Sequence, residues 1–64
     1  MTEIQSLARG LRILLMLSDS LDGSTVTEVA ENLGVDKGSA SRLVNTLVKY
    51  GFAEKDPVSR RISL

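Results

Sequence analysis

The chain has 64 residues, enough for one small domain, and a domain of this size buries only about 60 % of the surface that its unfolded chain exposes. It contains no cysteine and no histidine, which excludes disulfides and removes the commonest metal ligands and general bases, so neither a metal nor another cofactor is expected. Eight basic and eight acidic residues balance, but residues 1–35 carry two arginines against five acidic residues (−3), and residues 36–64 carry six basic against three acidic residues (+3).

The first predicted helix begins near Ser6, a good N-cap residue, and leads into a polar loop at residues 18–23. Leucines recur along it at spacings of three and four, which predicts one apolar face turned towards the core. That face comprises Leu7, Leu11, Leu14 and Leu15, with Ile4 as a further candidate. Gly10 lies inside the helix, where glycine costs about 1 kcal/mol relative to alanine, so either a neighbour packs closely there or the position is tolerant.

A second helix is predicted after the short β-prone segment 24–26, with Thr27 as its cap and Leu33 near its end. The residues expected to face inward are Val29, Ala30 and Leu33. Gly34 follows directly, at a position where left-handed backbone is common, and Val35 fills the turn. The second helix should therefore end in a tight, defined turn.

Asp36 is the expected cap of a third helix over residues 37–50, which Gly51 ends. The residues expected in its core face are Ala40, Leu43, Val44 and Leu47, with Val48 and Tyr50 as further candidates. Phe52 and Tyr50 are both expected in the core, because they are the only two aromatic side chains.

Two short strands are predicted to follow, at residues 52–55 and 61–64. They flank a turn in which Pro57 occupies the second position, and Ile62 and Leu64 should share one face. The whole order predicts a winged helix-turn-helix: a mainly α fold with a three-helix core and a short antiparallel sheet, in one domain over residues 1–64.

The stretch 27–51 has the pattern of a helix-turn-helix. Ala30 offers a small side chain where two helices pack, Gly34 follows four residues later, and Val35 supplies an apolar plug. In such a motif the second helix enters the major groove of DNA with its first residues on base edges. The residues on its outward face are small or capable of hydrogen bonding: Lys37, Gly38, Ser39, Ser41, Arg42 and Asn45. Arginine matches guanine edges and asparagine matches adenine edges.

On these residues the chain resembles the N-terminal DNA-binding domain of the IclR family of bacterial transcriptional regulators (isocitrate lyase regulator type). The similarity involves residues 6–11, 27–30, 34–37, Arg42-Leu43, Thr46-Leu47 and Gly51-Phe52. The chain departs from the family at Asp36, where proline is common, and at Gly38, where serine is common and would offer a hydroxyl to phosphate. The family's C-terminal effector-binding domain has no counterpart here, so the chain is expected to be an excised domain or a stand-alone relative that binds no small molecule.

These patterns predict an interface with double-stranded DNA, in which the recognition helix 37–50 enters the major groove and the wing 55–61 contacts the backbone or the minor groove. The residues assigned to it are Arg9, Thr27, Lys37, Ser39, Ser41, Arg42, Asn45, Arg60 and Arg61. The assignment of Arg9 is what the resemblance implies. Thr27 is first a helix cap and also offers its hydroxyl or N–H to a phosphate. The alternative for each of these residues is an ordinary solvated surface role.

The leading hypothesis is sequence-specific DNA binding in transcriptional control, as a homodimer on a palindromic or repeated site. The alternative is a winged-helix module for protein interaction or dimerisation without DNA binding, which the zero net charge leaves open. An enzyme is not expected, because the carboxylates fall on helix exteriors and caps without a nucleophile–base pair. The longest apolar run, residues 13–17, is too short to span a membrane and no signal-peptide pattern is present, so the expected location is the cytoplasm.

Overall fold

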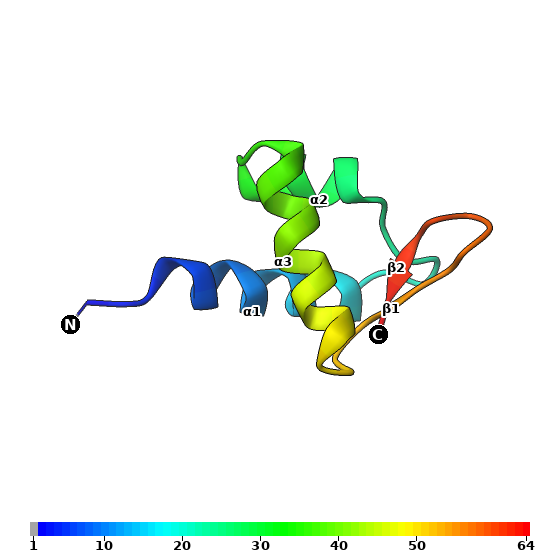
Figure 1. Ribbon diagram of the computed structural model, residues 1–64, viewed down its shortest axis with the longest axis horizontal. Helices are drawn as coiled ribbons and strands as arrows, with labels where there is room; N and C mark the ends of the chain where they lie inside the picture. Colours follow the sequence, from blue (N-terminus) through cyan, green and yellow to red (C-terminus); the bar gives the residue numbers. More distant parts are fainter. Residues whose placement is uncertain (1) are drawn as a thin grey trace.

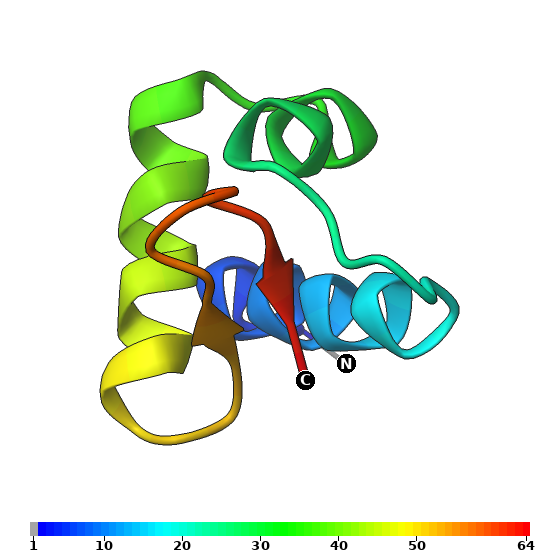
Figure 2. The same cartoon turned by 90° about the vertical axis from the view of Figure 1, so that its right-hand side faces the viewer.

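A computed structural model describes residues 2–64 and contains three helices followed by a two-stranded antiparallel hairpin. The elements are α1 (Gln5–Ser18), α2 (Val26–Leu33), α3 (Lys37–Lys49), β1 (Glu54–Lys55) and β2 (Ile62–Ser63). In Figure 1, α3 crosses α1, α2 lies at the N-terminal end of α3, and the hairpin lies beside both. Figure 2 shows the hairpin facing the viewer, with α1 behind it and α3 along one side. The predicted winged helix-turn-helix is confirmed. None of the helices described in residues 2–64 is long and apolar enough to cross a membrane.

Helix α1 buries a different face from the one that its leucine spacing predicts. Ile13 and Leu17 are buried, whereas most of the predicted face is more than half exposed: Ile4, Leu7, Leu11 and Leu15, with Leu14 half-buried. The helix is apolar over much of its circumference, and the core cluster of the other helices and Ile62 packs on the side of Ile13 and Leu17. The predicted cap was also wrong, because α1 starts at Gln5 after Ile4, and Ile4 makes no side-chain capping bond.

Helix α2 begins one turn of sequence earlier than predicted, because Thr25 and not Thr27 is its cap. The Thr25 hydroxyl accepts a hydrogen bond from Glu28 N (3.2 Å), and Glu28 Oε1 accepts one from Thr25 N (2.9 Å). This reciprocal capping box has the sequence signature Thr-x-x-Glu, which the choice of Thr27 overlooked. The predicted inward residues and the left-handed Gly34 (φ 70°) are confirmed. Val35 N then donates to Ala30 O (3.1 Å), which closes the turn.

Helix α3 follows its predicted cap Asp36 and ends at Lys49, one residue earlier than expected. Ala40 and Val44 are buried, with Leu43, Leu47 and Val48 packed against them. The aromatic prediction was wrong: Tyr50 is 68 % exposed and Phe52 is 61 % exposed. Tyr50 is the C-cap, beyond the last core-facing position, and the chain then reverses so that Phe52 N donates to Leu47 O (2.9 Å). Both rings therefore lie outside the core.

The wing is shorter than predicted, with Glu54 paired to Ser63 and Lys55 paired to Ile62. Asp56 shapes the tip, because its Oδ1 accepts hydrogen bonds from the N–H groups of Val58 (2.7 Å) and Ser59 (3.1 Å). The predicted strand at 24–26 reduces to a single bridge between Ser24 and Ile62. Leu64 does not share the buried face of Ile62, since it is 58 % exposed at the end of the chain.

The first testable consequence concerns the buried face of α1. Ile13→Ala should lower the free energy of unfolding by about 2–5 kcal/mol, because it leaves a cavity in the core. Leu15→Ala, on the exposed side of the same helix, should change it by less than about 0.5 kcal/mol. Urea unfolding of the two variants measures the difference. A larger loss from Leu15→Ala than from Ile13→Ala would contradict the packing described above.

The second consequence is a loss of stability in acid. Hydrogen bonds lower the pKa of three carboxyl groups: Glu28 through the Thr25 amide, Asp36 through the Ser39 hydroxyl and Asp56 through the Val58 amide. A carboxylate with a lowered pKa stabilises the fold above its ordinary pKa, and this stabilisation is lost as the pH falls through the folded pKa. The melting temperature should therefore be level above about pH 5 and fall below about pH 4.

Asp36→Asn provides the control for this titration, because asparagine is also a good N-cap but does not ionise. Its melting temperature should fall less than that of the wild type over the same pH interval. A wild-type melting temperature that is unchanged between pH 5 and pH 3 would refute the prediction.

Candidate nucleic-acid interface

The first turn of α3 is held rigidly by its cap. Asp36 Oδ2 accepts a hydrogen bond from Ser39 N (2.9 Å), and the Ser39 hydroxyl donates to Asp36 Oδ1 (2.6 Å). Lys37 and Gly38 lie between them and are exposed. This cap leaves the N–H groups at the start of α3 directed outward, where a helix end attracts anions.

Arg42 is partly ordered before any partner binds. Its Nη2 donates to the Ser39 hydroxyl (3.3 Å), one turn earlier on the same exposed side of α3. Asn45 is exposed one turn further along, and the Thr46 hydroxyl donates to the Arg42 carbonyl oxygen (2.8 Å). Ser39 is therefore occupied by Asp36 and Arg42, and it serves to orient Arg42 as much as to offer a contact of its own.

An open cleft of about 590 Å³ separates the N-terminal ends of α2 and α3 from the tip of the wing. It brings together four of the predicted site residues: Thr27, Lys37, Ser41 and Arg60. Thr25 and Ser59 also line it and were missed from sequence. The capping-box signature could have identified Thr25, whereas nothing local distinguishes Ser59 from other turn serines. Two cations, several hydroxyls and two helix N-termini make this cleft suited to anionic oxygen atoms.

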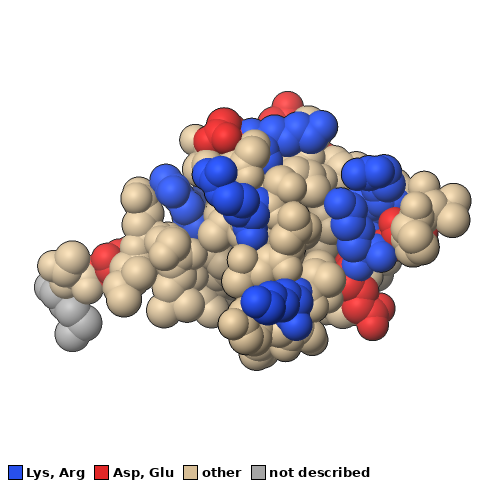
Figure 3. All heavy atoms as spheres, in the orientation of Figure 1, with Lys and Arg blue, Asp and Glu red and all other residues tan. Residues whose placement is uncertain are grey.

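A second, smaller hollow of about 220 Å³ joins α1 to α3 and brings Arg9 beside Ser39 and Arg42. The missed residues Ser6 and Thr46 share it. The predicted residues thus form one band that extends from Arg9 across α3 to Arg60. In Figure 3, Lys and Arg side chains spread over the face that carries α3 and the wing, while acidic side chains lie mostly at its margins.

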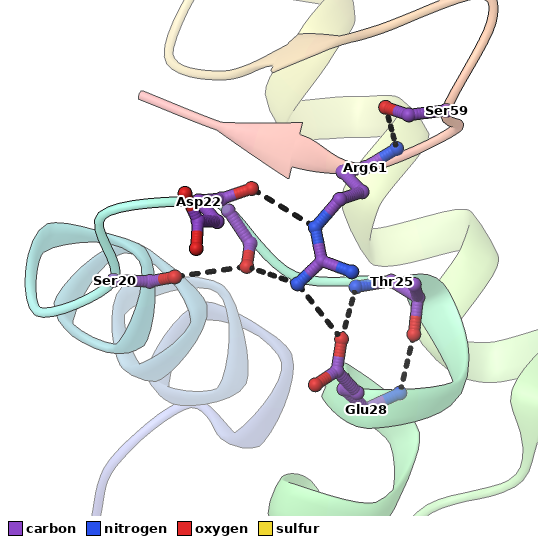
Figure 4. A network of polar contacts seen from close by, with 7 residues as sticks. Ser20, Asp22, Thr25, Glu28, Ser59 and Arg61 are labelled. Carbon is purple, nitrogen blue, oxygen red and sulfur yellow. Dashed lines mark hydrogen bonds and ion pairs between the residues drawn. The ribbon is translucent and has the colours of Figure 1, made fainter.

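Arg61 differs from the other predicted residues, because its side chain is directed at the body of the domain (Figure 4). Its Nε donates to Asp22 O and its Nη2 to Gly23 O, both at 2.9 Å. The same Nη2 lies 3.5 Å from Glu28 Oε1. Arg61 lines neither hollow.

The backbone at Arg60 is unusual: its φ is +64°, the left-handed region in which side chains are disfavoured. Arg60 is exposed, and its N–H donates to Asp56 O (2.8 Å) to close the wing turn. Within residues 2–64, no group of three or more acidic side chains is placed to hold a metal ion.

Comparisons with known proteins agree with this geometry. The family model for the IclR helix-turn-helix domain matches residues 6–57. The chain is 40 % identical over 62 residues to the HTH-type transcriptional regulator TsaQ1/TsaQ2 of Comamonas testosteroni, covering 95 % of this chain and 22 % of that protein. It is 32 % identical over 53 residues to the transcriptional repressor IclR of Escherichia coli, covering 83 % of this chain and 19 % of that protein.

A crystal structure of an IclR transcriptional regulator from Alicyclobacillus acidocaldarius superimposes with a TM-score of 0.90 at 42 % identity, covering 98 % of this chain and 26 % of that one. The chain therefore spans about a quarter or less of the length of these relatives. Their shared part is the helix-turn-helix domain, the DNA-binding type of domain in transcriptional regulators. The resemblance inferred from sequence is confirmed, and the chain belongs to the IclR family through its helix-turn-helix domain.

Proposed function

We propose that this domain binds specific sequences of double-stranded DNA, with the first turns of α3 in the major groove and the wing on the backbone or in the minor groove. The observation that carries the proposal is the band from Arg9 across α3 to Arg60, in which an exposed helix face adjoins a cationic cleft at its N-terminal end. A recognition helix presents its first residues to base edges in this arrangement.

The residues divide by the chemistry that each presents. Arg42 and Asn45 project from α3 and are proposed to contact base edges, where their side chains fit guanine and adenine. The cleft residues are proposed to hold phosphates of one backbone strand: Thr27, Lys37, Ser41 and Arg60. Arg9 is proposed to hold a phosphate on the other side of α3, beside Ser39. Phosphate contacts fix the register, and base contacts select the sequence.

The wider role follows from the same proposal. Residues 1–64 would be the DNA-binding part of a regulator that controls transcription in the bacterial cytoplasm, where chromosomal DNA lies. Repression is proposed by analogy with the relative named a transcriptional repressor. No catalytic step is proposed, because the acidic side chains beside the interface serve as helix and turn caps.

A second surface supports a dimer on DNA. The exposed leucines of α1 and the adjoining part of α3 line an apolar groove of about 510 Å³, with the members Ser6, Leu7, Gly10, Leu11, Leu14, Leu43, Thr46, Leu47 and Phe52. The space where a Cβ of Gly10 would project is open, with no atom within 4 Å. The groove shares Ser6, Leu43 and Thr46 with the hollow beside Arg42.

We propose a second copy of the domain as the occupant of this groove. A glycine in mid-helix is destabilising relative to alanine, and the close approach of another helix backbone would offset that cost. Because each copy has zero net charge, association brings no net repulsion. Contact at this groove would place two recognition helices on one DNA, as a site with two half-sites requires.

The first prediction from this proposal removes the central cation. Arg42→Ala should weaken binding to duplexes selected from a random pool by about 1–3 kcal/mol, at least tenfold, because a bidentate base contact is lost. The fold should persist, since Arg42 is exposed. Lys49→Ala is the matched control: it removes the same charge from the same helix about two turns further on, and it should bind nearly as the wild type does. Fluorescence anisotropy at several salt concentrations gives the affinities.

Two results would refute the proposed function. One is that the wild-type domain binds no selected duplex even at low salt, where phosphate contacts are strongest. The other is that Arg42→Ala and Lys49→Ala weaken binding equally, which would mean that α3 does not present the face assigned to it.

The next prediction tests the dimer groove. Leu11→Glu should abolish cooperative binding to duplexes with two half-sites about one helical turn apart, and leave binding to a single half-site nearly unchanged. Leu21→Glu is the control, because Leu21 is fully exposed in the loop after α1 and outside the groove. Mobility-shift titrations distinguish one from two bound copies. Equal cooperativity in the wild type and Leu11→Glu would exclude the groove as the contact.

A further inference from the structure

We infer that the two neighbouring wing arginines have separate tasks: Arg60 contacts the DNA backbone, and Arg61 is a positioning residue that holds the wing so that Arg60 reaches it. The inference rests on the proposed DNA binding and refines the prediction that both arginines contact DNA. It starts from the different surroundings of two residues that carry the same charge and lie side by side in the sequence.

Arg61 is fully engaged within the domain. Its guanidinium donates to the carbonyl oxygens of Asp22 and Gly23, both at 2.9 Å, and lies 3.5 Å from Glu28 Oε1. Figure 4 shows the side chain extending from the wing to the loop after α1 and to the start of α2. To reach a phosphate, Arg61 would have to give up both carbonyl bonds. A planar fork of donors can satisfy several acceptors at once, which a lysine ammonium does not match.

The acceptor Glu28 Oε1 also receives the Thr25 N–H (2.9 Å), so Arg61 joins the capping box at the start of α2. The Gly23 carbonyl oxygen that Arg61 contacts is likewise bound by the Ser20 hydroxyl (2.8 Å). Arg61 therefore links the wing to two segments that precede or begin α2. Thr25 and Thr27, at that same end of α2, form the wall of the cleft opposite Arg60.

Arg60 has the opposite character. It lines the cleft with Lys37 and Ser41, and its backbone is in the left-handed region (φ +64°). A residue with a Cβ is disfavoured in this conformation and glycine is not, so the fold alone would be served better by glycine. The turn hydrogen bond from Arg60 N to Asp56 O needs only the backbone. The Arg60 side chain thus contributes to the cleft and not to the wing, as strained residues at functional sites often do.

The test compares Arg60→Gly, Arg61→Ala, Arg61→Lys and the double variant Arg60→Gly/Arg61→Ala in the whole 64-residue domain. Arg60→Gly should keep or raise the melting temperature, weaken binding about tenfold, and lower the slope of log affinity against log salt by about one, because one phosphate contact is lost. Arg61→Ala should lower the melting temperature and weaken binding measured well below it. Its salt slope should be lowered only to the extent that Arg60 loses its contact.

The double variant separates positioning from a merely structural role. If Arg61 acts through Arg60, then Arg60→Gly should weaken binding much less in the Arg61→Ala background than in the wild type. A purely structural Arg61 would leave the effect of Arg60→Gly undiminished. Arg61→Lys provides the comparison if Arg61→Ala does not fold: a positioning arginine is not replaced by lysine, whereas a phosphate-contacting arginine is replaced largely by the same charge.

Three results would overturn the inference while the wild type still binds DNA. They are additive losses in the double variant, wild-type binding by Arg61→Lys, and a melting temperature that falls on Arg60→Gly by as much as on Arg61→Ala. Absence of wild-type binding to any selected duplex at low salt would instead refute the proposed function, and this inference with it.

Discussion

The pairing of Ile62 with Ser24 joins the wing to the helices, and every part of the candidate interface depends on it. The Ile62 side chain is completely buried in the core, and its backbone exchanges hydrogen bonds of 2.7 and 2.8 Å with Ser24. Because Ser24 directly precedes the α2 cap, this bridge fixes β2 at the N-terminal end of α2. The wing tip consequently lies across the cleft from the starts of α2 and α3. Without that bridge, a two-stranded hairpin of this length would have no defined place, since isolated hairpins are at best marginally stable.

The core that holds this arrangement is small, and three of its eight buried apolar residues are alanines: Ala30, Ala40 and Ala53. Small side chains let α2 and α3 approach closely at the turn between them, but they bury little apolar surface. Local motifs must then contribute much of the stability. The capping box at Thr25 and the Asp36 cap stabilise α2 and α3 at the ends that border the cleft. The same residues therefore stabilise the fold and direct the helix ends towards the candidate DNA-binding surface.

Zero net charge is compatible with DNA binding because the charges near this surface are unequally placed. The carboxylates of Glu28, Asp36 and Asp56 accept hydrogen bonds from N–H groups of their own helix or turn, and Arg61 lies beside Glu28. Lys37 and Arg60 line the open cleft instead. Since screening limits electrostatic interactions to about 10 Å at ordinary salt, the local arrangement decides how a phosphate is received, more than the total charge does.

The sequence by itself determined the parts of this protein that depend on neighbours a few residues away. Asp36 as a cap, Gly34 in the left-handed turn and the inward residues of α2 are local features, and the order of elements with the family resemblance followed from them. Only the tertiary structure decided which side of α1 is buried, because apolar residues lie around most of that helix and the position of Ile62 and the other helices selects Ile13 and Leu17. It likewise decided where the two wing arginines lie. They carry the same charge in adjacent positions, and what separates them is contact with Asp22, Gly23 and Glu28, which are distant in sequence and reach Arg61 only when the chain has folded.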